Sequence, residues 1–384
     1  MKEVLTTHRT VLSVHTDGPL RIALLGTRGI PNRYGGFEQI SETLAAGLAA
    51  RGHSVTVYCS GTHPDKSLCW QGVRRVLCTD PEERLGTFGQ FLYDRNCLRH
   101  AAREGYDALL FLGYTSSSVW GPWFPRGCAI LSNMDGLEWK RSKYAAPVRR
   151  FLRRAEAWAV RYSHRHIADS PVIKEYLDAR HGINSVYIPY GAEVRREHNA
   201  AALAPYGIRP DHYYMLMARM EPENHVAEIL EGYVRSGSAR HMLVVGNAAN
   251  RYGSMLRKRF SQHTGVRFLG PIFDQEAVHQ LRAQATLYFH GHSVGGTNPS
   301  LLEAMASGAF IAAHRNPFNS RILGDDALYF TTVGEVAQLI REHQETASRP
   351  QRTRHQQKIE RDYAWTPVID QYEQVIYQTC RALR

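Results

Sequence analysis

The chain has 384 residues, more than one ordinary domain contains, and its length suits two domains of roughly 150–200 residues each. Apolar residues make up 43% and charged residues 22%, and no stretch approaches the roughly 18 apolar residues of a membrane span. Six scattered cysteines without a CxxC pair argue against a disulfide framework or zinc site and fit a cytoplasmic compartment, while the net charge of +11 predicts an anionic partner or serves solubility alone.

Residues 1–20 lack an apolar segment and are predicted to be a polar N-terminal extension. A first α/β unit is predicted over residues 21–192. Its expected strands are Arg21–Gly26, Val55–Cys59 and Ala108–Gly113, and the first ends in glycine, as buried parallel strands often do. Ile40, Leu44 and Leu48 share one helical face between the first two strands. Strands that alternate with helices predict a parallel sheet covered by helices.

The alternation restarts in a second unit, predicted over residues 193–364. Its expected strands are Tyr214–Ala218, His241–Gly246, Val266–Gly270, Thr286–His290 and Phe310–Ala313. Apolar residues then recur at helical spacing from 365 to 384, which predicts a closing helix. The economical interpretation is an α/β protein built from two units.

Glycines follow the first strand, at Gly26, Gly29, Gly35 and Gly36. Glycines between a strand and a helix let the backbone approach a ligand, and a helix N-terminus attracts anions. The segment is neither the dinucleotide pattern G-x-G-x-x-G nor a P-loop. On their own, these glycines fit a tight turn as well as a ligand site.

A stronger signal is the segment from His292 to Gly308. Asn298 is a good helix N-cap residue, Pro299 suits the first helical position, and Gly308 suits the end of the helix. The backbone N–H groups before such a helix suit a diphosphate, and Glu303 is placed to accept hydrogen bonds from ribose hydroxyls. The alternative is an ordinary capped helix with an exposed glutamate.

Arg219 follows the strand that is expected at Tyr214–Ala218. The carboxyl ends of parallel strands form the ligand crevice of α/β sheets, and a guanidinium suits phosphate oxygens. A surface ion pair with a nearby glutamate is the alternative role for this side chain.

Four segments in this order resemble glycosyltransferase family 4, and more narrowly its rhamnosyltransferase-type subgroup. They are GTRGIP with YGGFE (26–38), NMDGLEWKR (133–141), ARMEPEN (218–224) and GGTNPSLLEAMASG (295–308). The resemblance extends over nearly the whole chain from residue 21. It implies the GT-B fold, in which two Rossmann-like domains face each other across a cleft and a C-terminal helix returns to the N-terminal domain. The acceptor is then expected on residues 21–192 and the nucleotide sugar on residues 193–364.

The resemblance also implies retaining transfer of a sugar, commonly from dTDP-β-L-rhamnose, to a glycan or a polyprenyl-diphosphate-linked saccharide in cell-surface polysaccharide synthesis. Neither a metal ion nor another cofactor is expected. No carboxylate nucleophile stands out in the sequence, which is compatible with same-face attack assisted by the leaving phosphate. Arg219 and the helix N-terminus at Asn298 would stabilise charge on that phosphate, and the two domains are expected to close around the donor by a hinge motion.

Individual residues correspond to the family pattern. Arg219 matches its diphosphate-binding arginine, Glu303 its ribose-binding glutamate, and Gly35 with Gly36 the N-domain loop that faces the phosphates. Asp135 lies near the position of a sugar-contacting histidine and is a candidate for the sugar or the acceptor, or else a turn residue.

The chain departs from the family pattern at two positions. Asn224 replaces a phosphate-binding lysine, and Gly295 replaces a glutamate that orients the donor sugar. The backbone N–H groups of Gly296, Thr297 and Asn298 are expected to take over part of the role of that glutamate.

A basic cluster lies between Trp139 and His166, where Glu156 is the only acidic residue. The cluster contains nine basic residues: Lys140, Arg141, Lys143, Arg149, Arg150, Arg153, Arg154, Arg161 and Arg165. Aromatic and aliphatic residues interleave with them, so a helix here could lie on an anionic membrane surface, with Lys140, Arg141, Arg149, Arg150, Arg153 and Arg154 facing the lipid or the acceptor. A helix whose charges are merely solvated is the equal alternative. Nucleic acid is not expected as a partner, because no nucleic-acid-binding motif is present.

Two other functions compete with rhamnosyl transfer. The same fold could use a UDP-hexose, and Glu303 does not discriminate because dTDP keeps the 3′-hydroxyl. A non-catalytic sugar-nucleotide-binding protein would account for Gly295 and Asn224.

Overall fold

The structure is a computed structural model that describes residues 18–33, 35–134, 136–141, 144–343 and 349–384. The N-terminal domain contains, within these ranges, a sheet in the order β3-β4-β2-β1-β5-β6-β7-β8, in which only the short β3 runs antiparallel to its neighbour. Its strands are β1 (Arg21–Leu25), β2 (Ser54–Ser60), β3 (Cys69–Trp70), β4 (Val73–Cys78), β5 (Ala108–Leu112), β6 (Ala129–Asn133), β7 (Arg165–Ala168) and β8 (Val186–Tyr187).

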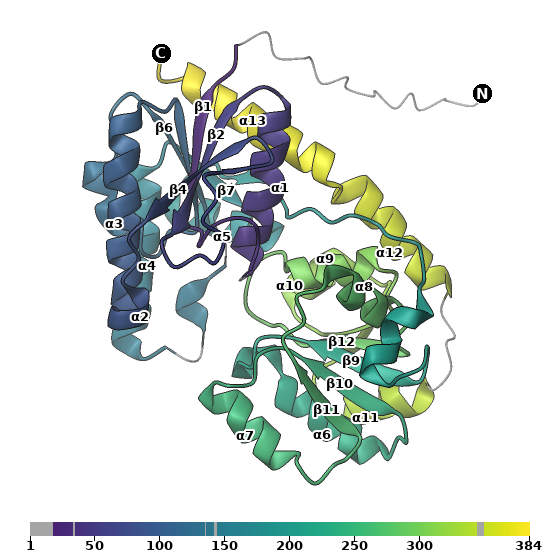
Figure 1. The fold of residues 1–384 in the computed structure, drawn as a ribbon. Coiled ribbons are helices and arrows are strands. Elements are labelled where there is room, and N and C mark those ends of the chain that lie inside the picture. The colour runs from purple at the N-terminus through teal and green to yellow at the C-terminus, as the bar shows by residue number, and fades with distance from the viewer. Residues whose placement is uncertain (1–17, 34, 135, 142–143, 344–348) are drawn as a thin grey trace, which may run out of the picture.

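Helices cover both faces of this sheet (Figure 1). They are α1 (Gly36–Ala50), α2 (Glu82–Leu85), α3 (Thr87–Glu104), α4 (Ala146–Tyr162) and α5 (Pro171–His181), with short 3₁₀ turns η1 (Ser118–Trp123) and η2 (Glu138–Lys140). Alternate residues of β1 explain the layers, since Ile22 and Leu24 pack in the cluster with α1 while Ala23 and Leu25 pack in the cluster with α3.

The C-terminal domain repeats this plan with a parallel sheet in the order β11-β10-β9-β12-β13-β14. Its strands are β9 (Tyr213–Met217), β10 (His241–Val245), β11 (Val266–Gly270), β12 (Leu287–His290), β13 (Ile311–His314) and β14 (Leu328–Phe330). Its helices are α6 (Val226–Ser236), α7 (Arg251–Arg259), α8 (Gln275–Ala283), α9 (Pro299–Ala306), α10 (Pro317–Leu323), α11 (Val333–Glu342) and α12 (Arg349–Asp362), with 3₁₀ turns η3 (Ala200–Tyr206) and η4 (Pro222–Asn224). The two predicted α/β units are therefore confirmed.

The final helix, α13 (Trp365–Arg381), returns to the N-terminal domain and lies along α1 (Figure 1). Arg51 at the end of α1 forms ion pairs of 2.5 Å with Asp370 and with Glu373. The side-chain amide of Asn133, at the end of β6, donates to the hydroxyl of Tyr372 over 3.0 Å. The predicted return of the C-terminal helix is confirmed.

Each sheet has a point where the strand order reverses, between β1 and β5 in the first domain and between β9 and β12 in the second. Ligands of open α/β sheets bind outside the carboxyl ends of the strands at such points. The loops after β1, β9 and β12 carry Gly35, Arg219 and Gly296. Strand order thus brings three of the predicted site segments toward one region.

Candidate active site

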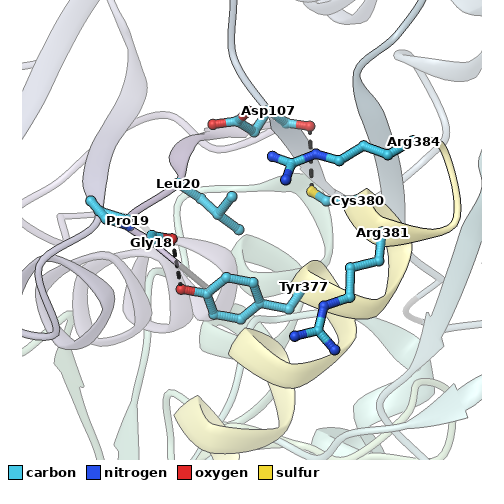
Figure 2. A pocket seen from close by; sticks show the side chains of 8 residues that line it. All are labelled: Gly18, Pro19, Leu20, Asp107, Tyr377, Cys380, Arg381 and Arg384. Atoms are coloured by element: carbon cyan, nitrogen blue, oxygen red, sulfur yellow. Dashed lines mark hydrogen bonds between the residues drawn. The ribbon is translucent and has the colours of Figure 1, made fainter. Parts of the chain in front are cut away.

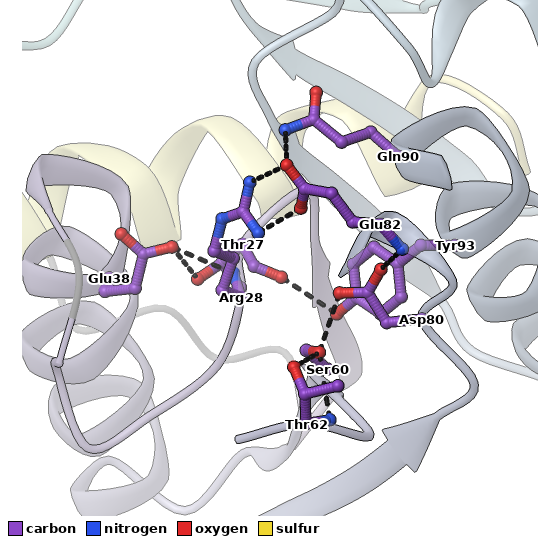
Figure 3. Close-up of polar contacts among 9 residues, drawn as sticks. All are labelled: Thr27, Arg28, Glu38, Ser60, Thr62, Asp80, Glu82, Gln90 and Tyr93. Atoms are coloured by element: carbon purple, nitrogen blue, oxygen red, sulfur yellow. Dashed lines mark hydrogen bonds and ion pairs between the residues drawn. The ribbon is translucent and has the colours of Figure 1, made fainter. Parts of the chain in front are cut away.

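The loop after β1 is fastened to its own domain by Glu38, which is 4% exposed (Figure 3). Oε1 of Glu38 accepts hydrogen bonds from the backbone N–H of Arg28 over 2.8 Å and from Oγ1 of Thr27 over 3.2 Å. Arg28 in turn pairs with Glu82, and the hydroxyl of Tyr93 donates to the carbonyl of Thr27 over 2.9 Å. These contacts hold the glycine loop in place before any ligand binds.

Gly35 and Gly36 begin α1, and they face the other domain. Gly35 is the N-cap of α1 and provides no side-chain cap, so the first N–H groups of the helix have no side-chain acceptor from that residue. A Cβ on Gly36 would lie 3.3 Å from Cγ of Pro299, the first residue of α9. The N-termini of α1 and α9 therefore meet across the domain boundary, and both present a positive dipole end to an anion there.

The loop before α9 has the predicted cap. Oδ1 of Asn298 accepts from the N–H of Ser300 over 2.9 Å. The hydroxyl of Thr297 donates to the backbone carbonyl of Asp169, which directly follows β7 of the N-terminal domain. The carboxylate of Asp169 is close to the same loop, since a Cβ on Gly296 would lie 1.9 Å from its Oδ1. Position 295 lacks the family glutamate, and the structure instead brings a carboxylate of the opposite domain to this loop.

Arg219 is exposed at the end of the segment after β9, and the structure gives its guanidinium no hydrogen bond or ion pair with any described residue. The predicted alternative, an ion pair with a nearby glutamate, is not found among those residues. Asn224 is 5% exposed, and its side-chain amide donates to the carbonyl of Arg219 over 2.8 Å. The predicted contact of Asn224 with the donor stays a prediction, and its amide also holds the Arg219 segment.

Glu303 lies on α9 with its side chain 24% exposed. Its Oε2 forms an ion pair of 2.6 Å with Nη1 of Arg282 from α8. Its Oε1 accepts from Nε2 of Gln39, on α1 of the other domain, over 2.6 Å. Glu303 is therefore an oriented carboxylate at the domain boundary, and the alternative of a merely exposed helix residue is wrong.

Histidines at the carboxyl end of β12 add no positive charge near neutral pH. His290 is 0% exposed, and burial lowers its pKa well below the usual value. Burial, followed by the charges of Arg219 and Arg141 and by His225, lowers the pKa of His292 to about 3. The rings of His290 and His292 stack with their centroids 4.5 Å apart. The positive charge beside this loop therefore comes from arginines and helix N-termini.

Arg141 was predicted to face a membrane or the acceptor; its burial does not fit a lipid-facing side chain, and an acceptor contact stays a prediction. Its side chain is only 14% exposed and forms ion pairs with Glu138 over 2.7 Å and with Glu223 of the C-terminal domain over 3.3 Å. Arg141 therefore links the two domains. Asp135 lies outside the described residues.

The remaining predicted basic residues do lie at the surface. Lys140, Arg149, Arg150, Arg153 and Arg154 are exposed. Val148, at the start of α4, is 41% exposed, and Phe88 of α3 is 62% exposed. Phe88 adjoins α4 through Phe91, whose ring centroid is 6.4 Å from that of Phe88 and 5.7 Å from that of Phe151. We call the four arginines of α4 with Val148 and Phe88 the basic surface.

Two cavities bear on where a ligand could bind. One, of about 270 Å³, lies between α13 and the segment before β1 and is lined by Tyr377, Asp107 and Arg381 among others (Figure 2). It is at the amino ends of the strands, opposite the edge where α/β sheets bind ligands. The other, between the loop at 292–298 and Phe318, holds about 10 Å³. Ligand sites usually measure about 300–1,000 Å³, so this small cavity alone does not accommodate a nucleotide sugar.

The sequence prediction missed Gln39, Asp169, Glu223 and Arg282 as members of this region. Gln39 directly follows the predicted YGGFE segment, and Asp169 follows a strand, so their positions next to the crevice were available signals. Arg282 had no such signal, because an arginine in a helical pattern is usually exposed. Within the described residues, no group of three or more His, Cys, Asp or Glu side chains is arranged to hold a metal ion.

Part of the chain is similar to a known protein family. Residues 34–196 match the family model described as Glycosyltransferase Family 4. No curated protein matches the sequence significantly. None of the helices in the described ranges is both long and apolar enough to cross a membrane.

Solved glycosyltransferase structures share the whole fold at low sequence identity. Sucrose-phosphate synthase from Thermosynechococcus elongatus aligns with a TM-score of 0.77 and 17% identity, over 94% of this chain and 100% of that one. Anabaena HepE in complex with UDP-glucose aligns with a TM-score of 0.72 and 15% identity, over 94% and 100%. The catalytic domain of starch synthase IV from Arabidopsis thaliana, bound to ADP and acarbose, aligns with a TM-score of 0.71 and 13% identity, over 95% and 100%. Residues 34–196 are thus similar to glycosyltransferase family 4, and the two domains together have the GT-B fold.

Proposed function

We propose that the chain is a retaining glycosyltransferase that uses a nucleoside diphosphate sugar, with dTDP-β-L-rhamnose as the donor and a glycan or polyprenyl-diphosphate-linked saccharide as the acceptor. The observation that carries the proposal is the convergence of three groups suited to such a donor. Arg219 provides a guanidinium without a partner among the described residues, α1 and α9 present their N-termini to each other, and Glu303 provides an oriented carboxylate.

The mechanism follows from the charge that develops on the leaving group. Departure of the nucleoside diphosphate builds negative charge on the β-phosphate, and Arg219 with the two helix N-termini is placed to stabilise it. These groups supply positive charge from the protein itself, so transfer is proposed to need no metal ion. Asp169 brings a carboxylate next to Gly296, where it is suited to orient hydroxyls of the donor sugar.

The domains must open to admit the donor and close again around it. Three polar contacts join the two domains in the structure: Gln39–Glu303, Thr297–Asp169 and Arg141–Glu223. Each is a polar contact that separation of the domains would expose to water. A hinge motion of this kind is common in enzymes that must exclude water from a transfer reaction.

A panel of nucleotides tests the proposal. Thermal shifts of the purified protein are measured with dTDP, UDP, GDP, ADP and NAD, followed by transfer assays with and without EDTA. Preferential stabilisation by dTDP, with EDTA-insensitive rhamnosyl transfer to a polyprenyl-diphosphate-linked sugar, is the expected result. Preference for UDP would replace the donor by a UDP-hexose, as HepE binds UDP-glucose. Binding without any transfer would favour a non-catalytic sugar-nucleotide-binding protein.

The basic surface supports an anionic membrane as the place where a lipid-linked acceptor is met. Changing Arg149, Arg150, Arg153 and Arg154 together to glutamine is expected to weaken binding to phosphatidylglycerol vesicles at least tenfold, because each basic residue near a lipid surface contributes about 1 kcal/mol. Vesicle sedimentation measures this.

The matched control places the same charge change on α7 of the other domain, where Arg251, Arg257, Lys258 and Arg259 are also exposed. That variant is expected to bind vesicles as the unmodified protein does. Equal losses in the two variants would mean that net charge alone attracts the protein to the vesicles.

A further inference from the structure

Arg282 is a buried arginine on α8 that is attached to one face of α9. It is 2% exposed, its Nη1 lies 2.6 Å from Oε2 of Glu303, and its Nη2 donates to Oγ of Ser300 over 3.2 Å. Ser300 and Glu303 are three residues apart and so share a helix face. The ring of Tyr288, from β12, lies 6.0 Å from the guanidinium carbon, and its hydroxyl is 2.9 Å from Oγ of Ser300.

Burial makes this ion pair persistent. A guanidinium removed from water is very unfavourable unless its charge is compensated, and Glu303 provides the opposite charge. The planar guanidinium also engages two groups of α9 in one orientation, which an ammonium group on a flexible stem would not do. Oε2 of Glu303 is therefore held by Arg282 whether or not a ligand is present.

The second oxygen of Glu303 is in a different situation. Oε1 accepts from Gln39 of the opposite domain over 2.6 Å, and the glutamate side chain is 24% exposed. Separation of the domains removes Gln39 but leaves Arg282 in place, because α8 and α9 belong to the same domain. One oxygen then faces the crevice while the carboxylate keeps its orientation.

We infer that Arg282 is the positioning residue of the nucleotide site: it holds Oε2 of Glu303 so that Oε1 accepts a ribose hydroxyl, which takes the place of Gln39. The inference rests on the proposed function, since it takes Glu303 as the ribose-binding residue. Arg282 itself does not touch the nucleotide. Its contribution is confined to nucleotides that carry a ribose hydroxyl.

That restriction provides the test. Affinities of dTDP and UDP are each compared with those of their 2′,3′-dideoxy analogues by calorimetry, and the ratio is the hydroxyl preference. The unmodified protein is expected to prefer the hydroxylated nucleotide at least tenfold, since hydrogen bonds to charged groups are worth that much. Glu303→Gln is expected to remove most of this preference. Arg282→Lys is expected to lower the preference about tenfold while the affinity for the dideoxy analogue stays unchanged.

Two further variants separate positioning from general stability. Combining Arg282→Lys with Glu303→Gln should lower the preference no further than Glu303→Gln alone, because both act through one carboxylate. Arg75→Lys is the matched control, since Arg75 is 1% exposed and paired with Asp65 in the other domain. It is expected to keep the full preference. If Arg282→Lys does not fold, Ser300→Ala removes one hydrogen bond of the guanidinium and should lower the preference severalfold.

The outcomes distinguish a failure of the inference about Arg282 from a failure of the proposed function. If Glu303→Gln loses the hydroxyl preference and Arg282→Lys and Ser300→Ala keep it, the inference about Arg282 is overturned and the ribose role of Glu303 stands. If Glu303→Gln keeps the preference, Glu303 does not bind ribose, and the inference fails with it. Absence of binding by every nucleotide overturns the proposed function itself.

Discussion

Arg219→Ala is expected to weaken the binding of dTDP or UDP at least tenfold and to lower kcat by about 100-fold. The Arg219 guanidinium is exposed and has no ion pair among the described residues, so its removal breaks no ion pair with any of them. Its charge reaches the loop before α9, because it contributes to the lowered pKa of His292. Where Arg219 stabilises negative charge that develops only as the leaving group departs, its loss lowers kcat. Where it stabilises the charge of the bound donor, its loss lowers the affinity.

Calorimetry with the nucleoside diphosphate and steady-state transfer rates measure the two effects separately. Arg251→Ala is the control, because Arg251 is another exposed arginine of the same domain, on α7. It should change neither quantity. An Arg219→Ala protein with unchanged affinity and turnover would show that the diphosphate is held elsewhere.

Gly291→Ala is expected to destabilise the protein by about 1–3 kcal/mol and to reduce nucleotide affinity at the same time. A Cβ on Gly291 would lie 2.0 Å from the backbone carbonyl oxygen of Asn224, which cannot move as a side chain could. The same two loops are joined next to this point, since the N–H of Ser293 donates to the carbonyl of Glu223 over 3.0 Å. An added methyl group therefore pushes the Arg219 segment away from the loop before α9.

Thermal and denaturant unfolding give the change in stability, and calorimetry gives the change in affinity. Gly334→Ala is the matched control, because a Cβ there meets only Oγ1 of Thr332 at 3.9 Å and alanine favours the helix α11. Its stability should stay the same or rise slightly. A Gly291→Ala protein as stable as that control would mean that the two loops are not in close contact in solution.

Local sequence was sufficient for most regular elements. The run Arg21–Leu25 forms β1 because its residues are apolar enough to be buried on both faces of a parallel sheet, and the same holds for β9 and β10. The cap at Asn298 was predictable because a cap depends on the residue itself and on the two or three that follow it. Short strands at the sheet edge, such as β8 (Val186–Tyr187), were not predicted, since two residues carry no periodic pattern.

The candidate site was predictable only in part, because several of its contacts join residues that are far apart in the chain. The residue types of Arg219 and Glu303, and their places at strand and helix ends, indicate their chemistry. Asn224 and Arg141 were assigned to ligands from sequence position, and the structure adds contacts that the sequence did not predict, with a backbone carbonyl and with a glutamate of the other domain. Such contacts depend on which loops the fold brings together.

By itself, the sequence determined two parallel α/β units, the closing helix and the residues best suited to a nucleoside diphosphate sugar, because these depend on hydrophobic periodicity and on neighbouring residues. The tertiary structure decided which polar and charged side chains are paired with one another. Gln39 and Glu303 are 264 positions apart in the chain, and Arg282 is buried against Glu303 from a different helix. The physical reason is that burial and electrostatic pairing depend on distance in space, which the order of strands in the two sheets sets and which no local pattern records.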